Sequence, residues 1–229
     1  AEAAFHRVLA REPGHAVALL NLGILLTARG ALDEARGVLE ASLAARPGHP
    51  GTLLALGNVH DRAGDAFAAA AAWREAATAN PGFAEAHANL GGALAQMGQT
   101  AEAEAALRRA LAINPRLAIA HERLGEICLA TGRLAEAEAA LREVTSRDPR
   151  AGTAFNSLGL ALRGQGRLPD ALVAFRSAIA ARPNLAEAQA NLAALLAFLG
   201  DGAAATAAAD RALALAPGDD RVQMAATVA

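Results

Sequence analysis

Six histidines are the side chains in this sequence best suited to catalysis or metal binding. His15 and His49 stand 34 residues apart, as do His87 and His121, and a fixed step of this kind indicates a structural repeat. Equivalent residues of successive repeats lie about one repeat apart in space, whereas a zinc–nitrogen bond is only about 2 Å long. We therefore interpret the histidines as structural residues, with a metal or catalytic role as the alternative, and we expect no cofactor.

Cys128 is the single cysteine, which excludes an intrachain disulfide framework and a cysteine-cluster metal site. We interpret it as a small buried hydrophobe. The sequence contains no Gly-rich phosphate loop, nucleophile elbow or HExxH motif. We therefore predict that no enzyme active site lies within these residues.

Arginines recur at the same 34-residue step, at Arg74, Arg108, Arg142 and Arg176. Glu104 and Glu138 precede two of them by four residues, a helical spacing at which an ion pair stabilises by about 0.2–0.5 kcal/mol. This pattern favours a location of these residues on a solvent-exposed outer face of the repeats, where they form surface ion pairs. The alternative is an anionic partner that docks on this face.

The composition limits the classes of partner. The net charge is −2, which gives no overall attraction to nucleic acid or to an anionic membrane. The longest apolar runs have eight residues, whereas a membrane-spanning helix needs about 20. We predict neither nucleic-acid binding nor membrane insertion. The absence of lysine and the excess of alanine favour a bacterial origin, and we expect a cytoplasmic location.

Prolines, glycines and alanines show which elements the repeat contains. In each repeat, a glycine ends one helix, the first helix, and a proline follows another, the second helix. This order predicts antiparallel helix pairs joined by short turns. The proline series is Pro13, Pro47, Pro81, Pro115, Pro149, Pro183 and Pro217, and the helix-ending glycines are Gly30, Gly64, Gly98, Gly132, Gly166 and Gly200. A packing series runs Gly23, Gly57, Gly91, Gly125 and Gly159 and then changes to Ala193, which indicates close contact between the two helices of each pair.

We predict one solenoid over residues 1–229. The second half of a repeat occupies 1–15, and a further helix starts within 220–229. The full repeats are 16–49, 50–83, 84–117, 118–151, 152–185 and 186–219.

The pattern Leu19, Leu22-Gly23, Leu26, Ala35, Leu39, Pro47 resembles the tetratricopeptide repeat, in which conserved places recur over 34 residues. Phe155, Leu158-Gly159, Leu162, Ala171, Phe175 and Pro183 repeat it, although the Tyr place of the family is never Tyr here. The resemblance implies an all-α, right-handed superhelical solenoid. First helices would line a concave groove, which in this family usually binds an extended peptide or a partner's helix.

Groove residues are expected two places before each packing glycine, with neighbours on the same face. Asparagine could pair there with a peptide backbone, because it carries both a donor and an acceptor. The asparagines resemble the ladder in the repeat arm of O-linked N-acetylglucosamine transferase. The predicted groove residues are Leu20, Asn21, Ile24, Leu54, Asn58, Asn89, Arg123, Asn156, Ser157 and Asn191.

A more local resemblance concerns repeats that clamp a partner's C-terminal carboxylate. Asn58, Asn89 and Arg123 match three of the five places of that clamp in spacing. Leu54 and Ile119 stand at its two lysine places. The alternative is a looser polar patch in the middle of the groove.

The resemblance implies a protein–protein interaction scaffold that binds a peptide or partner segment. One alternative is a substrate-recruiting arm of a larger enzyme, such as a glycosyltransferase or sulfotransferase, whose catalytic domain lies outside these residues. Another is self-assembly into a homo-oligomer through exposed repeat ends. We expect the chain to be part of a longer bacterial protein.

Overall fold

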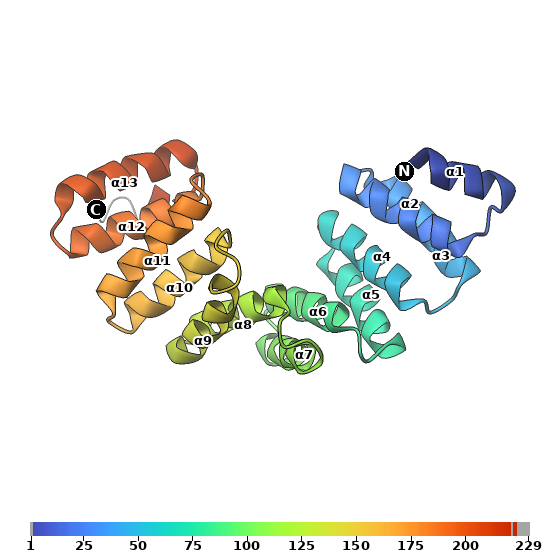
Figure 1. Ribbon diagram of the computed structural model, residues 1–229, viewed down its shortest axis with the longest axis horizontal. Helices are drawn as coiled ribbons and strands as arrows, with labels where there is room; N and C mark the ends of the chain where they lie inside the picture. Colours follow the sequence, from blue (N-terminus) through green and yellow to red (C-terminus); the bar gives the residue numbers. More distant parts are fainter. Residues whose placement is uncertain (1, 221, 224–229) are drawn as a thin grey trace. The chain divides into compact units, whose positions relative to one another are not determined.

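The computed structural model describes residues 2–220, 222 and 223, and within these residues it contains α-helices and turns but no strand. The predicted all-α class is confirmed (Figure 1). The chain divides into two compact units, residues 1–120 (unit 1) and 121–229 (unit 2), and each unit is described by itself. A single solenoid over the whole chain stays a prediction, and most of the helix expected within 220–229 lies outside the described residues.

In unit 1, each first helix packs against the second helix that follows it, and successive pairs pack on one another. The pairs are α2 with α3, α4 with α5, and α6 with α7, and α1 packs on α2. The helices are α1 (Glu2–Arg11), α2 (Ala16–Arg29), α3 (Leu32–Ala45), α4 (Pro50–Arg62), α5 (Ala66–Ala79), α6 (Ala84–Gln96) and α7 (Thr100–Ile113).

Unit 2 continues the same pattern, and the division between the units falls within α8 (Ala118–Ala130). The pairs α10 with α11 and α12 with α13 pack closely, and α10 also packs on α9. The other helices are α9 (Leu134–Thr145), α10 (Gly152–Gly164), α11 (Leu168–Ala181), α12 (Ala186–Phe198) and α13 (Gly202–Leu215).

The ends of the first pair show why the sequence forms these helices. Gly30 ends α2 with φ 83°, a left-handed conformation that glycine adopts without steric cost. Asp33 and Glu34 occupy the first turn of α3, where their negative charge favours the positive end of the helix dipole. Pro50 is among the first residues of α4, where its missing N–H costs no helical hydrogen bond.

The packing glycines bring first and second helices close together, as the sequence predicts. A Cβ atom at Gly57 would lie 2.3 Å from Nε1 of Trp73, and one at Gly159 would lie 2.5 Å from Cε1 of Phe175. These second-helix side chains are buried, with Trp73 4% and Phe175 0% exposed. The large side chain of α5 or α11 therefore fills the space left by the missing Cβ.

The last pair reverses this arrangement. Ala193 of α12 takes the glycine place, and Ala209 of α13 takes the place of the large residue. Both are buried in one small cluster, at 0% and 6% exposure. The additional methyl on the first helix is thus offset by a smaller partner on the second.

Candidate functional site

The side-chain amides of Asn58 and Asn89 meet on the first helices α4 and α6 of unit 1. Nδ2 of Asn89 donates to Oδ1 of Asn58 at 3.2 Å. Nε1 of Trp73 donates to the same oxygen at 3.3 Å, and also to the carbonyl of Leu54 at 3.3 Å. Asn58 is therefore tied to its own helix pair through Trp73 and to the next pair through Asn89.

The indole N–H fixes the orientation of both amides. An indole nitrogen can only donate, so the Asn58 atom that it contacts must be the carbonyl oxygen. Asn89 must then donate its own N–H to that oxygen. Within the described residues, this leaves Nδ2 of Asn58 and Oδ1 of Asn89 without a hydrogen-bond partner, while no buried side-chain polar atom there is unsatisfied. Neither atom is therefore fully buried, so one donor of Asn58 and one acceptor of Asn89 remain for a partner.

A hollow of 370 Å³ adjoins Asn58 between α2 and α4. Asp61 and Arg62 place opposite charges at one end of it, and Ile24 is 50% exposed. The lining residues are Ile24, Thr27, Ala28, Ala55, Asn58, Asp61 and Arg62. The combination of apolar surface with convergent polar groups is typical of a binding site.

The remaining predicted groove residues of unit 1 differ in their environments. Asn21 is exposed on α2 and makes no side-chain hydrogen bond within the described part of the chain. Leu20 and Leu54 are half-buried and pack against core clusters. The amide pair and Ile24 are therefore the parts of the prediction that adjoin one another.

Unit 2 contains a second amide pair. Nδ2 of Asn191 on α12 donates to Oδ1 of Asn156 on α10 at 3.0 Å. Asn156 is only 6% exposed, whereas Asn191 and the neighbouring Ser157 are half-buried. The asparagines of neighbouring first helices thus bond to one another in both units. A likeness to the transferase arm stays a prediction.

Arg123 lies on α8 among acidic residues of unit 2. Its Nη1 lies 3.4 Å from Oε2 of Glu126, and Glu122 accepts a hydrogen bond from Oγ1 of Thr153 at 2.6 Å. Desolvation raises the pKa of Glu126, the charge of Arg123 opposes this rise, and the charge of Glu122 adds to it. Asn58 and Asn89 belong to unit 1, so a clamp that also uses Arg123 stays a prediction.

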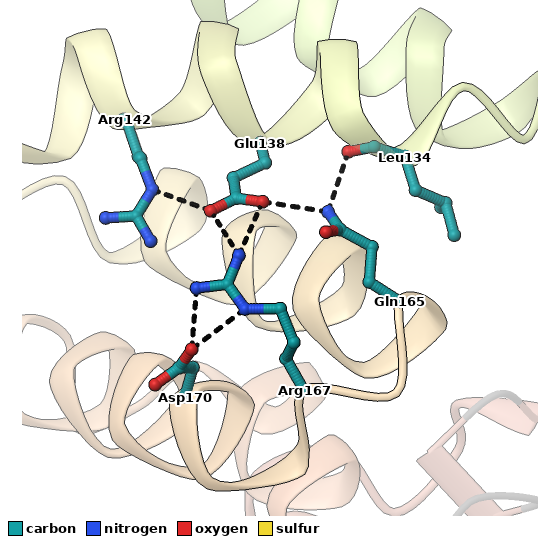
Figure 2. Close-up of polar contacts among 6 residues, drawn as sticks. All are labelled: Leu134, Glu138, Arg142, Gln165, Arg167 and Asp170. Atoms are coloured by element: carbon teal, nitrogen blue, oxygen red, sulfur yellow. Dashed lines mark hydrogen bonds and ion pairs between the residues drawn. The ribbon is translucent and has the colours of Figure 1, made fainter.

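The predicted ion pairs form on second helices. Arg108 pairs with Glu104 at 2.6 Å, and Arg142 pairs with Glu138 at 2.8 Å. The carboxylate of Glu138 also accepts hydrogen bonds from Nη1 of Arg167 at 2.7 Å and from Nε2 of Gln165 at 2.9 Å. Figure 2 shows both donors coming from the turn before α11. The contacts join two successive helix pairs.

Burial of Glu138 disfavours its charged form, but hydrogen bonds from Gln165, Arg142 and Arg167 outweigh burial and lower its pKa to about 2. Glu138 is therefore ionised at neutral pH. Its side chain is only 14% exposed, so the network acts as a structural joint rather than as an accessible anion.

Two histidines cap helices, a role that the sequence analysis missed. Nδ1 of His15 accepts the backbone N–H of Ala18 at 3.1 Å, and Nδ1 of His49 accepts that of Thr52 at 3.2 Å. Their position directly before a helix was the available signal. His87 is half-buried. Cys128 is 1% exposed, as predicted.

Among the residues that the structure describes, no three His, Cys, Asp or Glu side chains are grouped so that they could hold a metal ion. Within the same residues, no helix has the length and hydropathy needed to span a bilayer.

The architecture defines a class of protein, the repeat proteins built from stacked helix pairs. Family models described as tetratricopeptide repeat match residues 1–56, 94–158 and 162–228, and a second such model matches 54–118. The chain belongs to the tetratricopeptide-repeat family. Proteins of this family generally serve as protein-interaction scaffolds, and the fold is typically non-catalytic. No curated protein sequence matches the chain significantly.

Solved structures share the fold at low sequence identity. One chain of the Cut9–Hcn1 hetero-tetramer of APC/C matches with TM-score 0.87 and 18% identity, over 97% of this chain and 44% of that one. PilF of Pseudomonas aeruginosa matches with TM-score 0.81 and 19% identity, over 91% and 95%. YrrB, described as a tetratricopeptide-repeat protein with an unusual peptide-binding site, matches with TM-score 0.64 and 23% identity, over 82% and 97%.

Proposed function

We propose that this chain binds an extended peptide or partner segment along its first helices, and that Asn58 and Asn89 pair with the main chain of that segment. The observation that supports this most is the hydrogen bond between the two amides, which leaves one donor of Asn58 and one acceptor of Asn89 unpaired and not fully buried. A peptide group offers one acceptor and one donor, so a main chain can satisfy both. Recognition of this kind depends little on the side chains of the partner.

The hollow beside Asn58 supplies the side-chain part of the interaction. Ile24 and Ala55 offer apolar surface, and a peptide anchored at Asn58 can place one apolar side chain there. Burial of such a side chain favours binding by removing apolar surface from water. The family's general use as interaction scaffolds and the peptide-binding site described for YrrB support the proposal.

The test begins with peptides selected from a random library against the whole chain. Their affinities are then measured for Asn89→Ala and for Asn184→Ala, a control in an exposed turn of unit 2. Loss of one net hydrogen bond should weaken binding roughly 2- to 12-fold in Asn89→Ala. Binding by the control should be unchanged. A library that yields no binder, or equal affinities for the two variants, would refute the proposal.

A further inference from the structure

A second hollow, of 490 Å³, lies in unit 2 between the second helices α9 and α11. Phe155, Leu158 and Leu162 of α10 form an apolar floor. Thr145 of α9 and Val173 of α11 line opposite sides, and Val173 is 63% exposed. These second helices are distinct from the helices that carry the amide pairs.

Three departures from the repeat meet in this hollow. Thr145 stands where the other full repeats have Leu43, Ala77, Leu111, Ile179 and Leu213. Val173 stands where they have Gly37, Ala71, Ala105, Ala139 and Ala207. Phe155 stands where they have Leu19, Leu53, His87, His121 and Gln189. The other repeats of the chain therefore serve as a reference, and the residues at this hollow differ from them at three places.

The helix beside the hollow also departs from the repeat. α9 has 12 residues, whereas α3, α5, α7, α11 and α13 each have 14. The early end leaves Ser146 at the edge of the hollow. The hydroxyl of Thr145 makes no hydrogen bond to any residue that the structure describes.

The charged residues of the rim are already paired. Arg142 lies 2.8 Å from Glu138, Asp170 lies 2.6 Å from Arg167, and Glu143 pairs with Arg147. Figure 2 shows the first two of these pairs. The hollow therefore offers no uncompensated charge to an ionic ligand, and a charged group placed over its apolar floor would lose hydration without gaining a partner.

We propose that the hollow between α9 and α11 is a second docking site, which takes a neutral apolar side chain from a partner peptide. The volume lies within the range of about 300–1,000 Å³ typical of ligand pockets. Thr145 supplies a hydrogen bond to the peptide main chain at the rim. None of the predicted groove residues lines this hollow, although α10 forms its floor and also carries Asn156.

The test uses the isotopically labelled whole chain and N-acetyl-leucine methylamide as a probe. Backbone amide resonances of Thr145, Ser146 and Val173 should shift and saturate, with a roughly millimolar Kd for a ligand of this size. Because the probe is neutral, the Kd should not change between low and high salt. N-acetyl-lysine methylamide and inorganic phosphate should leave these resonances unmoved.

Val173→Arg places a charge at the mouth of the hollow and should weaken probe binding by on the order of tenfold or more. Ala105→Arg, at the equivalent exposed place of α7, is the matched control and should bind as wild type. Equal binding by the two variants, absence of shifts, or stronger shifts with the charged probes would overturn the proposal. Concentration-dependent shifts without any probe would identify a second copy of the chain as the occupant and overturn it too.

Discussion

His49 caps α4 in its neutral form, because its Nδ1 accepts the backbone N–H of Thr52. Burial and then the positive charge of Arg46 lower the pKa of its imidazole below 6.5. The unfolded chain therefore takes up a proton near pH 6.5 that the folded chain takes up only at lower pH. The free energy of unfolding should decrease as the pH falls through this window.

This pH dependence can be measured by urea unfolding at about pH 7.5 and about pH 5.5. His49→Asn keeps a capping side chain but cannot titrate, so the decrease between the two pH values should be smaller than in wild type. Identical pH dependence in both proteins would show that His49 does not contribute.

Arg123→Glu tests the polar surface of α8. The charge of Arg123 opposes the raised pKa of Glu126, so its replacement by a carboxylate should raise that pKa further. An NMR titration of the Glu126 carboxyl group measures this directly. Because Arg123 is a predicted groove residue, the same variant should weaken partner binding without changing helicity, and unchanged affinity would remove Arg123 from the predicted groove.

At this scale, the sequence singled out the asparagines as candidate groove residues but did not predict their pairing. A series at the 34-residue step contains Asn89 and Asn191, whereas their partners Asn58 and Asn156 stand 31 and 35 residues earlier. Pairs of this kind depend on the relative rotation of neighbouring helices, which a repeat period does not give. The histidine caps were missed because Ser, Thr, Asp and Asn are the usual N-cap residues.

At the scale of the helix pair, the packing glycines and the exposed glycines should respond oppositely to alanine. Gly57→Ala places a Cβ against the buried ring of Trp73 and should destabilise the protein by about 1–3 kcal/mol. Gly37→Ala lies in α3 with nothing within 4 Å of the added Cβ, and should stabilise by about 0.5–1 kcal/mol. Chemical denaturation measures both, and effects of the same sign would contradict this account.

The hydrogen-bond and ion-pair network around Glu138 also acts at the scale of the helix pair. Its pKa of about 2 lies below the ordinary 4.5, so the stabilisation is present above about pH 4.5 and is lost as the pH falls toward 2. Glu138→Gln should destabilise unit 2 by about 1–2 kcal/mol at pH 7, since solvent screens part of the interaction. The difference between wild type and variant should shrink below about pH 4. A difference that is constant with pH would show that the charge is not responsible.

Helix ends and packing positions followed from the sequence because each depends on local chemistry. Gly30 ends α2, and the packing glycines lie against large residues of the second helices. The network around Glu138 could be predicted only in part from the sequence, because Glu138 and Arg142 share a helix whereas Arg167 and Gln165 come from the next pair. Contacts between pairs need the three-dimensional arrangement.

At the scale of the whole molecule, the 34-residue step was sufficient to predict an all-α protein of helix pairs, because each pair needs a neighbour to bury its apolar face. It was not sufficient to identify binding surfaces. The hollow near Val173 arises from departures from the repeat, and a periodic pattern predicts only what is repeated.

The proposed function depends on the pairing of Asn58 and Asn89 with a peptide main chain. Its most direct test is NMR of their side-chain amides and of the indole N–H of Trp73, the single tryptophan, during titration with a library-selected peptide. The amide N–H₂ resonances of Asn58 should move downfield, while the Trp73 resonance should keep its hydrogen-bonded position. Asn58 resonances that stay unchanged at saturating peptide would contradict the claim.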